Sequence, residues 1–277
     1  MRLWLIGASS GAWSAACASF TADAPIPSPE AGADAALVEG GAGDGQSGPD
    51  AAHGDAMPTT VEITTTTGVK FAIDATEVTV ARFNAFRASQ DAGAVFPQCP
   101  GKVALGPNTS AGCHAATDHD QPVTCVDWCD AKAYCESLGK RLCGKIGGGA
   151  FVRGTEADPK VDEWARACGG PVGSAWPYGG QPMATACNTQ EAVKAAPLSV
   201  ATLPSCVGGE PLLFDMSGNV NEWEDACVAA DGGTARKCLL RGGSFKHTTS
   251  ESSCTYVVLL AASAVADDVG IRCCKDL

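Results

Sequence analysis

A histidine and a cysteine lie close together in the segment "LRGGSFKHTTSESSCTY", and both could do chemistry. A deprotonated Cys254 could act as a nucleophile or bind a soft ion such as Cu(I), and the imidazole of His247 is a competent metal ligand. Alternatively, Cys254 forms a disulfide and offers no thiol. We favour the disulfide, because the other cysteines of an exported domain provide thirteen potential partners.

The cysteine content favours an oxidising compartment. The chain has 15 cysteines, and setting aside Cys17, which falls in a leader-like segment, leaves 14, enough for seven bridges. Such density is typical of exported proteins, although the sequence does not give the connectivity. The segment "CVDWC" has Cys-x-x-x-Cys spacing, and no paired Cys-x-x-Cys motifs follow it, so we do not expect zinc.

The N-terminal region is predicted to direct export. Residues 1–17 have one positive charge, a short apolar run and small residues, as in a signal peptide. The small residues before Cys17 also resemble a bacterial lipoprotein signal, although Ser14 stands where Leu is usual. A plain secretory signal is the alternative. Residues 18–60 hold seven acidic residues and no Lys or Arg, and their Ala, Gly, Asp and Pro content predicts a disordered linker.

The predicted domain therefore covers residues 61–277. The formal charge is 19 minus 31, or −12, and no basic stripe is present, so a nucleic-acid partner is not expected. Contact with a membrane is expected only through a lipid on Cys17. We expect a monomer located in the cell envelope or secreted.

Three early elements are predicted from spacing and caps. Alternating β-branched residues over Val61–Ile73 predict strands with a turn near Gly68. A helix capped by Thr79 is predicted from the spacing of Val80, Phe83 and Phe86.

A second helix is predicted in "VDWCDAKAYCESLGKRLC", with Asp127 as its cap and Gly139 at its end. Ala131, Cys135 and Leu138 share one face, and Cys135 is expected to link this helix to the core. A further short helix is predicted over Val161–Cys168.

Seven motifs occur in order over most of Asp74 to Cys274: "DATEVTVARFNAF", "QPVTCVDWCDAKAYCESLGKRL", "DEWARACGG", "WPYGG", "LFDMSGNVNEWED", "LRGGSF" and "GIRCC". Together they resemble the formylglycine-generating enzyme, or sulfatase-modifying-factor, family over about three-quarters of the chain. The resemblance implies a single α+β domain with an irregular, loop-rich, C-type-lectin-like fold. Two departures are an insertion from Gly144 to Val161 and Asn221 in place of the family's Trp.

The acidic segment "DMSGNVNEWED" could hold a hard cation, because calcium takes six to eight oxygen ligands. The resemblance implies a structural calcium bound by the side chains of Asp215 and Glu222 and the backbone oxygens of Gly218 and Val220. Asn188 resembles a ligand of a second calcium in the family. The alternative is that these carboxylates only satisfy backbone amides of a buried loop.

The family's activity is oxidation of a cysteine in a sulfatase to formylglycine, using O₂ and copper held between two thiolates. In the family these thiols follow Gly-Gly-Ser-aromatic. Here His247 occupies the first thiol position, and Cys254 matches the second only with an insertion of two residues. The apolar run after Cys254 also replaces a basic stretch that helps to hold substrate in the family. We therefore expect the oxidase activity to be absent.

The sequence is compatible with three functions. The leading hypothesis is a calcium-stabilised binding or structural module for a protein, peptide or glycan ligand that the sequence does not identify. A second is a diverged copper or thiol oxidoreductase that uses Cys254 with His247. A third, suggested by the lectin-like fold alone, is calcium-dependent carbohydrate binding.

Overall fold

The computed structural model describes residues 60–90, 99, 102, 104–109, 112–148, 153–192, 194–229 and 236–277. The predicted signal peptide and the linker up to residue 59 lie outside the described residues. Across the described part of the chain, no helix is both long enough and apolar enough to cross a membrane.

The first sheet has four antiparallel strands in the order β1-β2-β8-β3. The outer hairpin joins β1 (Thr60–Thr64) to β2 (Lys70–Asp74), and its turn uses Gly68 with a φ of 85°. The C-terminal strand β8 (Cys273–Asp276) lies between β2 and the two-residue β3 (Arg141–Leu142). The predicted early strands and their turn are therefore confirmed.

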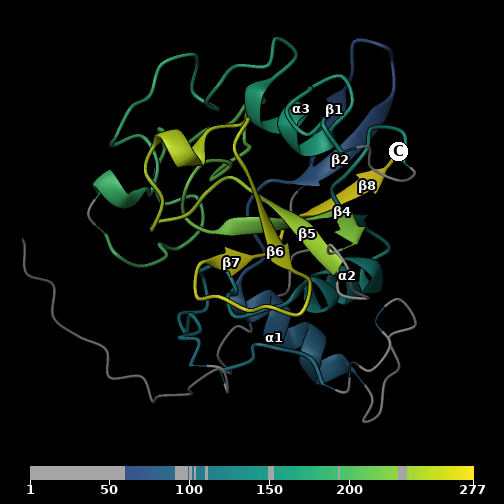
Figure 1. Ribbon diagram of the computed structural model, residues 1–277, viewed down its shortest axis with the longest axis vertical. Coiled ribbons are helices and arrows are strands. Elements are labelled where there is room, and N and C mark those ends of the chain that lie inside the picture. The colour runs from purple at the N-terminus through teal and green to yellow at the C-terminus, as the bar shows by residue number, and fades with distance from the viewer. Residues whose placement is uncertain are drawn as a thin grey trace, which may run out of the picture. The chain divides into compact units, whose positions relative to one another are not determined.

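The second sheet has the order β6-β5-β4-β7. Its long central strands are β4 (Asn221–Ala229) and β5 (Arg236–Arg241), and β6 (Val257–Ala261) forms one edge. The short β7 (Val269–Gly270) pairs in parallel with the start of β4. This pairing brings segments far apart in sequence together at the start of β4 (Figure 1).

Three helices begin at side-chain caps. The side chain of Thr79 accepts from the third residue of α1 (Val80–Ser89), and Asp127 forms a capping box with Asp130 at α2 (Trp128–Ser137). Asp162 caps α3 (Glu163–Gly169), so this helix begins two residues later than predicted. The first two predictions are confirmed. Two short 3₁₀ helices, η1 (Gln190–Ala192) and η2 (Ser250–Ser252), lie in the loops.

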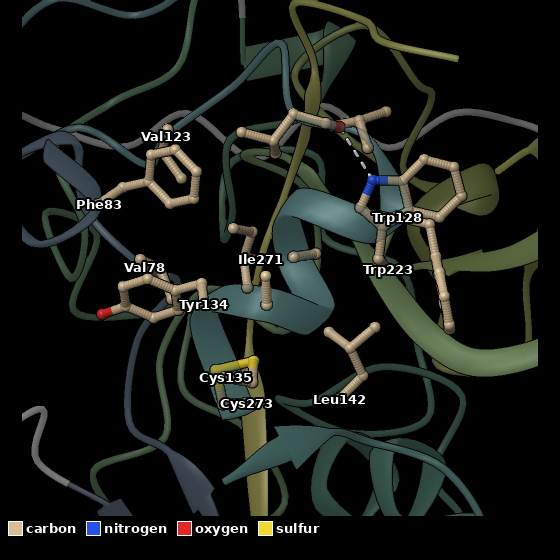
Figure 2. Close-up of a cluster of buried hydrophobic side chains, with 14 of the residues drawn as sticks. Val78, Phe83, Val123, Trp128, Tyr134, Cys135, Leu142, Trp223, Ile271 and Cys273 are labelled. Atoms are coloured by element: carbon tan, nitrogen blue, oxygen red, sulfur yellow. Dashed lines mark hydrogen bonds between the residues drawn. A yellow bond between two sulfur atoms is a disulfide. The ribbon is translucent and has the colours of Figure 1, made fainter. Parts of the chain in front are cut away.

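Two main apolar clusters form the core. The larger packs α1 and α2 against the second sheet, with Phe83, Phe86 and Tyr134 in mutual ring contact. Figure 2 shows this cluster with the indole of Trp223 donating to the carbonyl of Val126. The second cluster lies around β1, β2 and α3 and includes Ile63, Phe71, Trp164 and Leu213.

Seven disulfides staple the domain, and they use all 14 cysteines that follow Cys17. The expected even pairing and the core link of Cys135 are confirmed. The pairs are Cys99–Cys129, Cys113–Cys125, Cys135–Cys273, Cys143–Cys274, Cys168–Cys254, Cys187–Cys206 and Cys227–Cys238. Few helices, short strands and dense disulfides make this the predicted α+β, loop-rich domain.

Candidate functional site

The predicted thiol position is closed by a disulfide. Cys254 is 2% exposed and is bonded to Cys168 at the end of α3. The disulfide predicted for Cys254 is therefore confirmed. His247 lies seven residues earlier, with a side chain 25% exposed, and its Nδ1 is 2.7 Å from the hydroxyl of Ser244. The structure thus places an imidazole, but no free thiol, at this position.

The acidic loop before β4 is shaped by residues in the left-handed region of φ. Asp215, Gly218 and Asn219 have φ values of 58°, 73° and 57°. At Gly218 a Cβ atom would lie 2.4 Å from the backbone oxygen of Asn188, so only glycine fits. The amide of Asn219 donates to that same oxygen at 2.8 Å. The loop therefore brings the predicted residues Asp215, Gly218 and Asn188 into one buried region.

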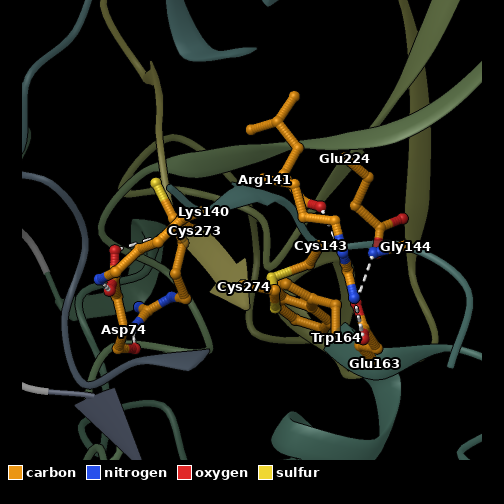
Figure 3. Close-up of a disulfide and its surroundings, with 12 residues drawn as sticks. Asp74, Lys140, Arg141, Cys143, Gly144, Glu163, Trp164, Glu224, Cys273 and Cys274 are labelled. Carbon is orange, nitrogen blue, oxygen red and sulfur yellow. Dashed lines mark hydrogen bonds and ion pairs between the residues drawn. A yellow bond between two sulfur atoms is a disulfide. The ribbon is translucent and has the colours of Figure 1, made fainter. Parts of the chain in front are cut away.

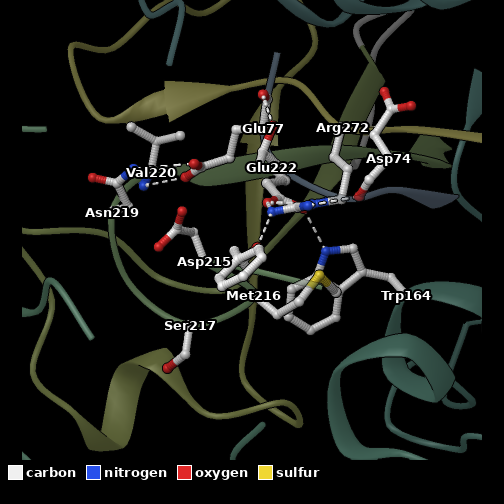
Figure 4. Close-up of polar contacts among 12 residues, drawn as sticks. Asp74, Glu77, Trp164, Asp215, Met216, Ser217, Asn219, Val220, Glu222 and Arg272 are labelled. Carbon is white, nitrogen blue, oxygen red and sulfur yellow. Dashed lines mark hydrogen bonds and ion pairs between the residues drawn. The ribbon is translucent and has the colours of Figure 1, made fainter. Parts of the chain in front are cut away.

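Glu222 is held by neutral and cationic donors at the start of β4. The indole nitrogen of Trp164 donates to Oε2 at 2.6 Å, and Nε of Arg272 donates to Oε1 at 2.8 Å (Figure 4). The same guanidinium donates to the backbone oxygens of Asp74 and Phe214. Both carboxylate oxygens of Glu222 therefore accept hydrogen bonds, and Arg272, which directly precedes β8, binds three separate segments.

Two further carboxyl groups face the same guanidinium. Asp215 accepts from the amide of Ala201 at 2.6 Å, and burial raises the pKa of Asp215 to about 6. Glu77 accepts from the side chain of Asn219 at 3.0 Å, and burial, followed by the charge of Asp215, raises the pKa of Glu77 well above 4.5. Three carboxyls, on Glu77, Asp215 and Glu222, thus share one nearby cation, Arg272.

The predicted calcium ligands fit a cation unequally. Asn188 is buried, and its Oδ1 has no hydrogen-bond partner among the described residues, so a cation would satisfy it. Asp215 accepts a hydrogen bond from one backbone amide through Oδ2. Glu222, in contrast, is committed to Arg272 and Trp164. Residues 60–277, where described, contain no group of three or more His, Cys, Asp or Glu side chains arranged for a metal. Calcium stays a prediction.

A second buried ionic cluster, formed by Asp162, Glu224 and Arg241, was not foreseen from the sequence. All three side chains are fully buried, and the guanidinium lies 3.7 Å from Asp162 and 3.9 Å from Glu224. It also stacks 4.7 Å from the ring of Trp164. Burial raises the pKa of Asp162 to about 6, and burial with the charge of Asp162 raises that of Glu224 well above 4.5.

Paired charges surround the Cys143–Cys274 disulfide nearby (Figure 3). Lys140 forms an ion pair with Asp74, and both side chains are almost fully buried. Arg141 binds Glu163 through two nitrogens, at 2.6 and 2.7 Å. These contacts hold the start of β3 against β2 and α3.

The chain belongs to the sulfatase-modifying-factor family. The family described as Sulfatase-modifying factor enzyme 1-like domain matches residues 23–277, which confirms the resemblance seen in the motifs.

Solved structures share its fold. CarF is 24% identical, with a TM-score of 0.52 over 75% of this chain and 87% of CarF. PvdO from Pseudomonas aeruginosa is 21% identical, with a TM-score of 0.53 over 76% of this chain and 82% of PvdO. At these identities the likeness concerns the fold alone.

A curated relative is the serine/threonine-protein kinase Pkn1 of Chlamydia trachomatis, 28% identical over 173 residues. The match covers 56% of this chain and 24% of Pkn1, so the chain spans about a quarter of that protein.

Proposed function

We propose that this chain is an exported family member that lacks formylglycine-generating oxidase activity and works as a monomeric binding or structural module. The single observation that carries the proposal is the Cys168–Cys254 disulfide, combined with His247 in the family's first thiol position. Copper held between two thiolates requires both sulfurs to be reduced, and here one is absent and the other is bonded. The ligand is proposed to be a protein, peptide or glycan, and a lipid on Cys17 would hold the module at a membrane.

The export part of the proposal is supported by seven disulfides in the described domain, a density typical of oxidising compartments.

A thiol count and a copper titration test the lost activity. The oxidised domain, unfolded without reductant, is expected to contain no free thiol, and the folded domain to bind no stoichiometric Cu(I). A sulfatase-derived cysteine peptide is expected to stay unmodified under O₂ with added copper. The rival oxidoreductase, which uses Cys254 with His247, predicts the opposite. Stoichiometric Cu(I) binding that is lost in Cys254→Ser and kept in His114→Gln would overturn the proposal.

Calcium is proposed as a structural ion of this module. The excess of carboxyl groups around Arg272 supports it, because a dication would offset their charge, and the unpartnered Oδ1 of Asn188 supports a second calcium. The first ion would be held by Asp215 and the backbone oxygens of Gly218 and Val220, and Glu222 would join only by giving up its present donors. We expect calcium to raise the melting temperature relative to EDTA, and Asp215→Asn to reduce that rise. An identical melting temperature with calcium and EDTA would remove calcium from the proposal.

A further inference from the structure

A carboxylate, a hydroxyl and an imidazole form a connected row beside the closed thiol position. The hydroxyl of Ser244 donates to Oδ2 of Asp268 at 2.7 Å, and the same oxygen of Ser244 lies 2.7 Å from Nδ1 of His247. The direct separation of His247 Nδ1 from Asp268 Oδ2 is 3.9 Å. The imidazole therefore reaches the carboxylate through the serine.

The available hydrogen atoms set the direction of these bonds. A serine hydroxyl has one proton, and Ser244 gives it to Asp268, because an ionised carboxylate can only accept. The oxygen of Ser244 also accepts from the amide of Lys246 at 3.2 Å. The remaining bond must then be donated by Nδ1 of His247. A neutral imidazole with its proton on Nδ1 carries its lone pair on Nε2.

The lone pair of His247 is available to a ligand. The imidazole is a quarter exposed, and no hydrogen bond joins its Nε2 to any of the described residues. Four further groups lie nearby: the ring of Tyr256 at 6.2 Å, the carboxylate of Glu251, and the ion pair between Lys246 and Asp267. The row thus has a buried anionic end and an outward basic end.

Asn221 supplies a second, independent observation. Its side chain is 2% exposed and its amide nitrogen lies 3.3 Å from the backbone oxygen and 3.4 Å from Oδ2 of Asp268. Its Oδ1 is buried without a hydrogen-bond partner in the described part of the chain. Asn221 and His247 are two positions at which this chain departs from its family, and both lie against the Ser244–Asp268 pair. Both departures from the family therefore lie in the same hydrogen-bonded group of side chains.

We propose that Asp268, Ser244 and His247 form a hydrogen-bonded relay whose outward end, Nε2 of His247, accepts a proton from a ligand or substrate that presents a hydroxyl group. As the ligand oxygen bonds to an acyl carbon, its proton moves to Nε2, the proton on Nδ1 stays in its bond to Ser244, and Asp268 offsets the positive charge. The oxygen that leaves the acyl carbon then takes the proton from Nε2. The relay deepens the proposed binding function, because it names the position and the chemical class of the ligand. It rests on that function only in requiring no thiolate at Cys254.

The tautomer of His247 is the first test. Long-range proton–nitrogen NMR of the full chain with labelled histidine is expected to show the Nδ1–H form for His247. Wild-type protein suffices for this test, so no variant has to fold. A His247 signal of the Nε2–H form would overturn the relay. The copper titration and the thiol count report on Cys254 and not on His247. Failure of the proposed loss of oxidase activity can therefore be distinguished from failure of the relay.

Hydrolysis of 4-nitrophenyl acetate tests the proton-accepting end, with water as the hydroxyl compound. Water adds to the ester carbonyl while Nε2 takes one of its protons. The bond between the acyl carbon and the 4-nitrophenyl oxygen then breaks, that oxygen takes the proton from Nε2, and acetic acid and 4-nitrophenol are released. We expect His247→Gln to lower the rate by about a hundredfold, the lower end of the effect of an oriented base. His119→Gln, which changes an exposed histidine, should keep the wild-type rate.

The variants Asp268→Asn and Asp267→Asn are a matched pair that tests the carboxylate at the buried end of the relay. Both remove one carboxylate from neighbouring positions, but Asp267 pairs with the exposed Lys246 and lies outside the relay. We expect Asp268→Asn to lower the rate of ester hydrolysis about as much as His247→Gln, while Asp267→Asn leaves it unchanged. Equal rates in the two Asn variants, or a wild-type rate in His247→Gln, would overturn the proposal.

Discussion

Two buried ionic clusters lie on either side of Trp164, and they differ in how completely their polar atoms are paired. Around Arg272, the guanidinium donates to Glu222 and to two backbone oxygens, and Glu222 has a donor at each oxygen. Around Arg241, the described residues leave Nε and Nη1 of the guanidinium and both oxygens of Glu224 without hydrogen-bond partners. Burial is the same in both clusters, whereas the pairing is different.

The difference indicates separate roles for the two clusters. A buried charge with all its hydrogen bonds made holds segments in a fixed geometry, and removal of one partner leaves an uncompensated charge. A buried carboxyl with few donors instead lowers its cost by taking up a proton. We infer that Arg272 fixes the loop before β4, and that Asp162 and Glu224 respond mainly to pH.

The largest effect is expected from Arg272→Met. This change leaves Glu222 buried beside Asp215 without its cation and frees two backbone oxygens. The expected loss in the free energy of unfolding is about 3–5 kcal/mol, as for other broken buried ion pairs. Urea unfolding of the oxidised domain measures it. A loss below that of Arg241→Met would contradict the comparison.

The second prediction concerns the pH dependence of Asp162→Asn, which keeps an oxygen for the cap of α3. The folded-state pKa of Asp162, about 6, lies above its ordinary value of 3.8, so its contribution to stability is fully present below pH 4. That contribution is lost as the pH rises from 4 to 6. The variant should therefore gain roughly 2–3 kcal/mol relative to wild type between pH 4 and pH 7.

Urea midpoints at several pH values provide this measurement. A difference between Asp162→Asn and wild type that stays constant from pH 4 to pH 7 would show that Asp162 does not titrate in this range. Asp158→Asn, a change of an acidic side chain in the preceding turn, is the control and should give parallel curves.

The smallest effect is expected from Arg241→Met. Among the described residues, its guanidinium makes one hydrogen bond, to the backbone oxygen of Cys254 at 3.1 Å, and it stacks on Trp164. The neighbouring carboxyls can take up protons once the cation is removed. We expect a loss of about 1–2 kcal/mol at pH 5, close to that of a single charged hydrogen bond. A larger loss at pH 7 than at pH 5 is also expected, and its absence would refute the assigned role of protonation.

Local features of the fold could be predicted from sequence, because their causes are local. Thr79 and Asp127 cap the predicted helices, and Gly68 makes the predicted turn. The predicted start of α3 at Val161 is two residues too early. The apolar pattern includes Val161, whereas the cap at Asp162 makes Glu163 the first helical residue. Caps and turns involve neighbours within a few residues, and this is why they are readable.

The site was predictable only in part, because its contacts are distant in sequence. Arg272 meets Glu222 across 50 residues, and Glu77 meets Asn219 across 142. No spacing rule relates such residues, and the motif "GIRCC" gave no sign of the partner of its arginine. The same applies to Asp268, which reaches His247 through Ser244, a residue 24 positions earlier in the chain.

The adjacent Cys273 and Cys274 also determine when the domain can be completed. Neighbouring residues on a strand point to opposite faces, and these two bond Cys135 in one apolar cluster and Cys143 in the other. Both bridges must wait until β8 has been synthesised, after every other strand and helix described. Neither bridge can therefore lock its apolar cluster before β8 has left the ribosome.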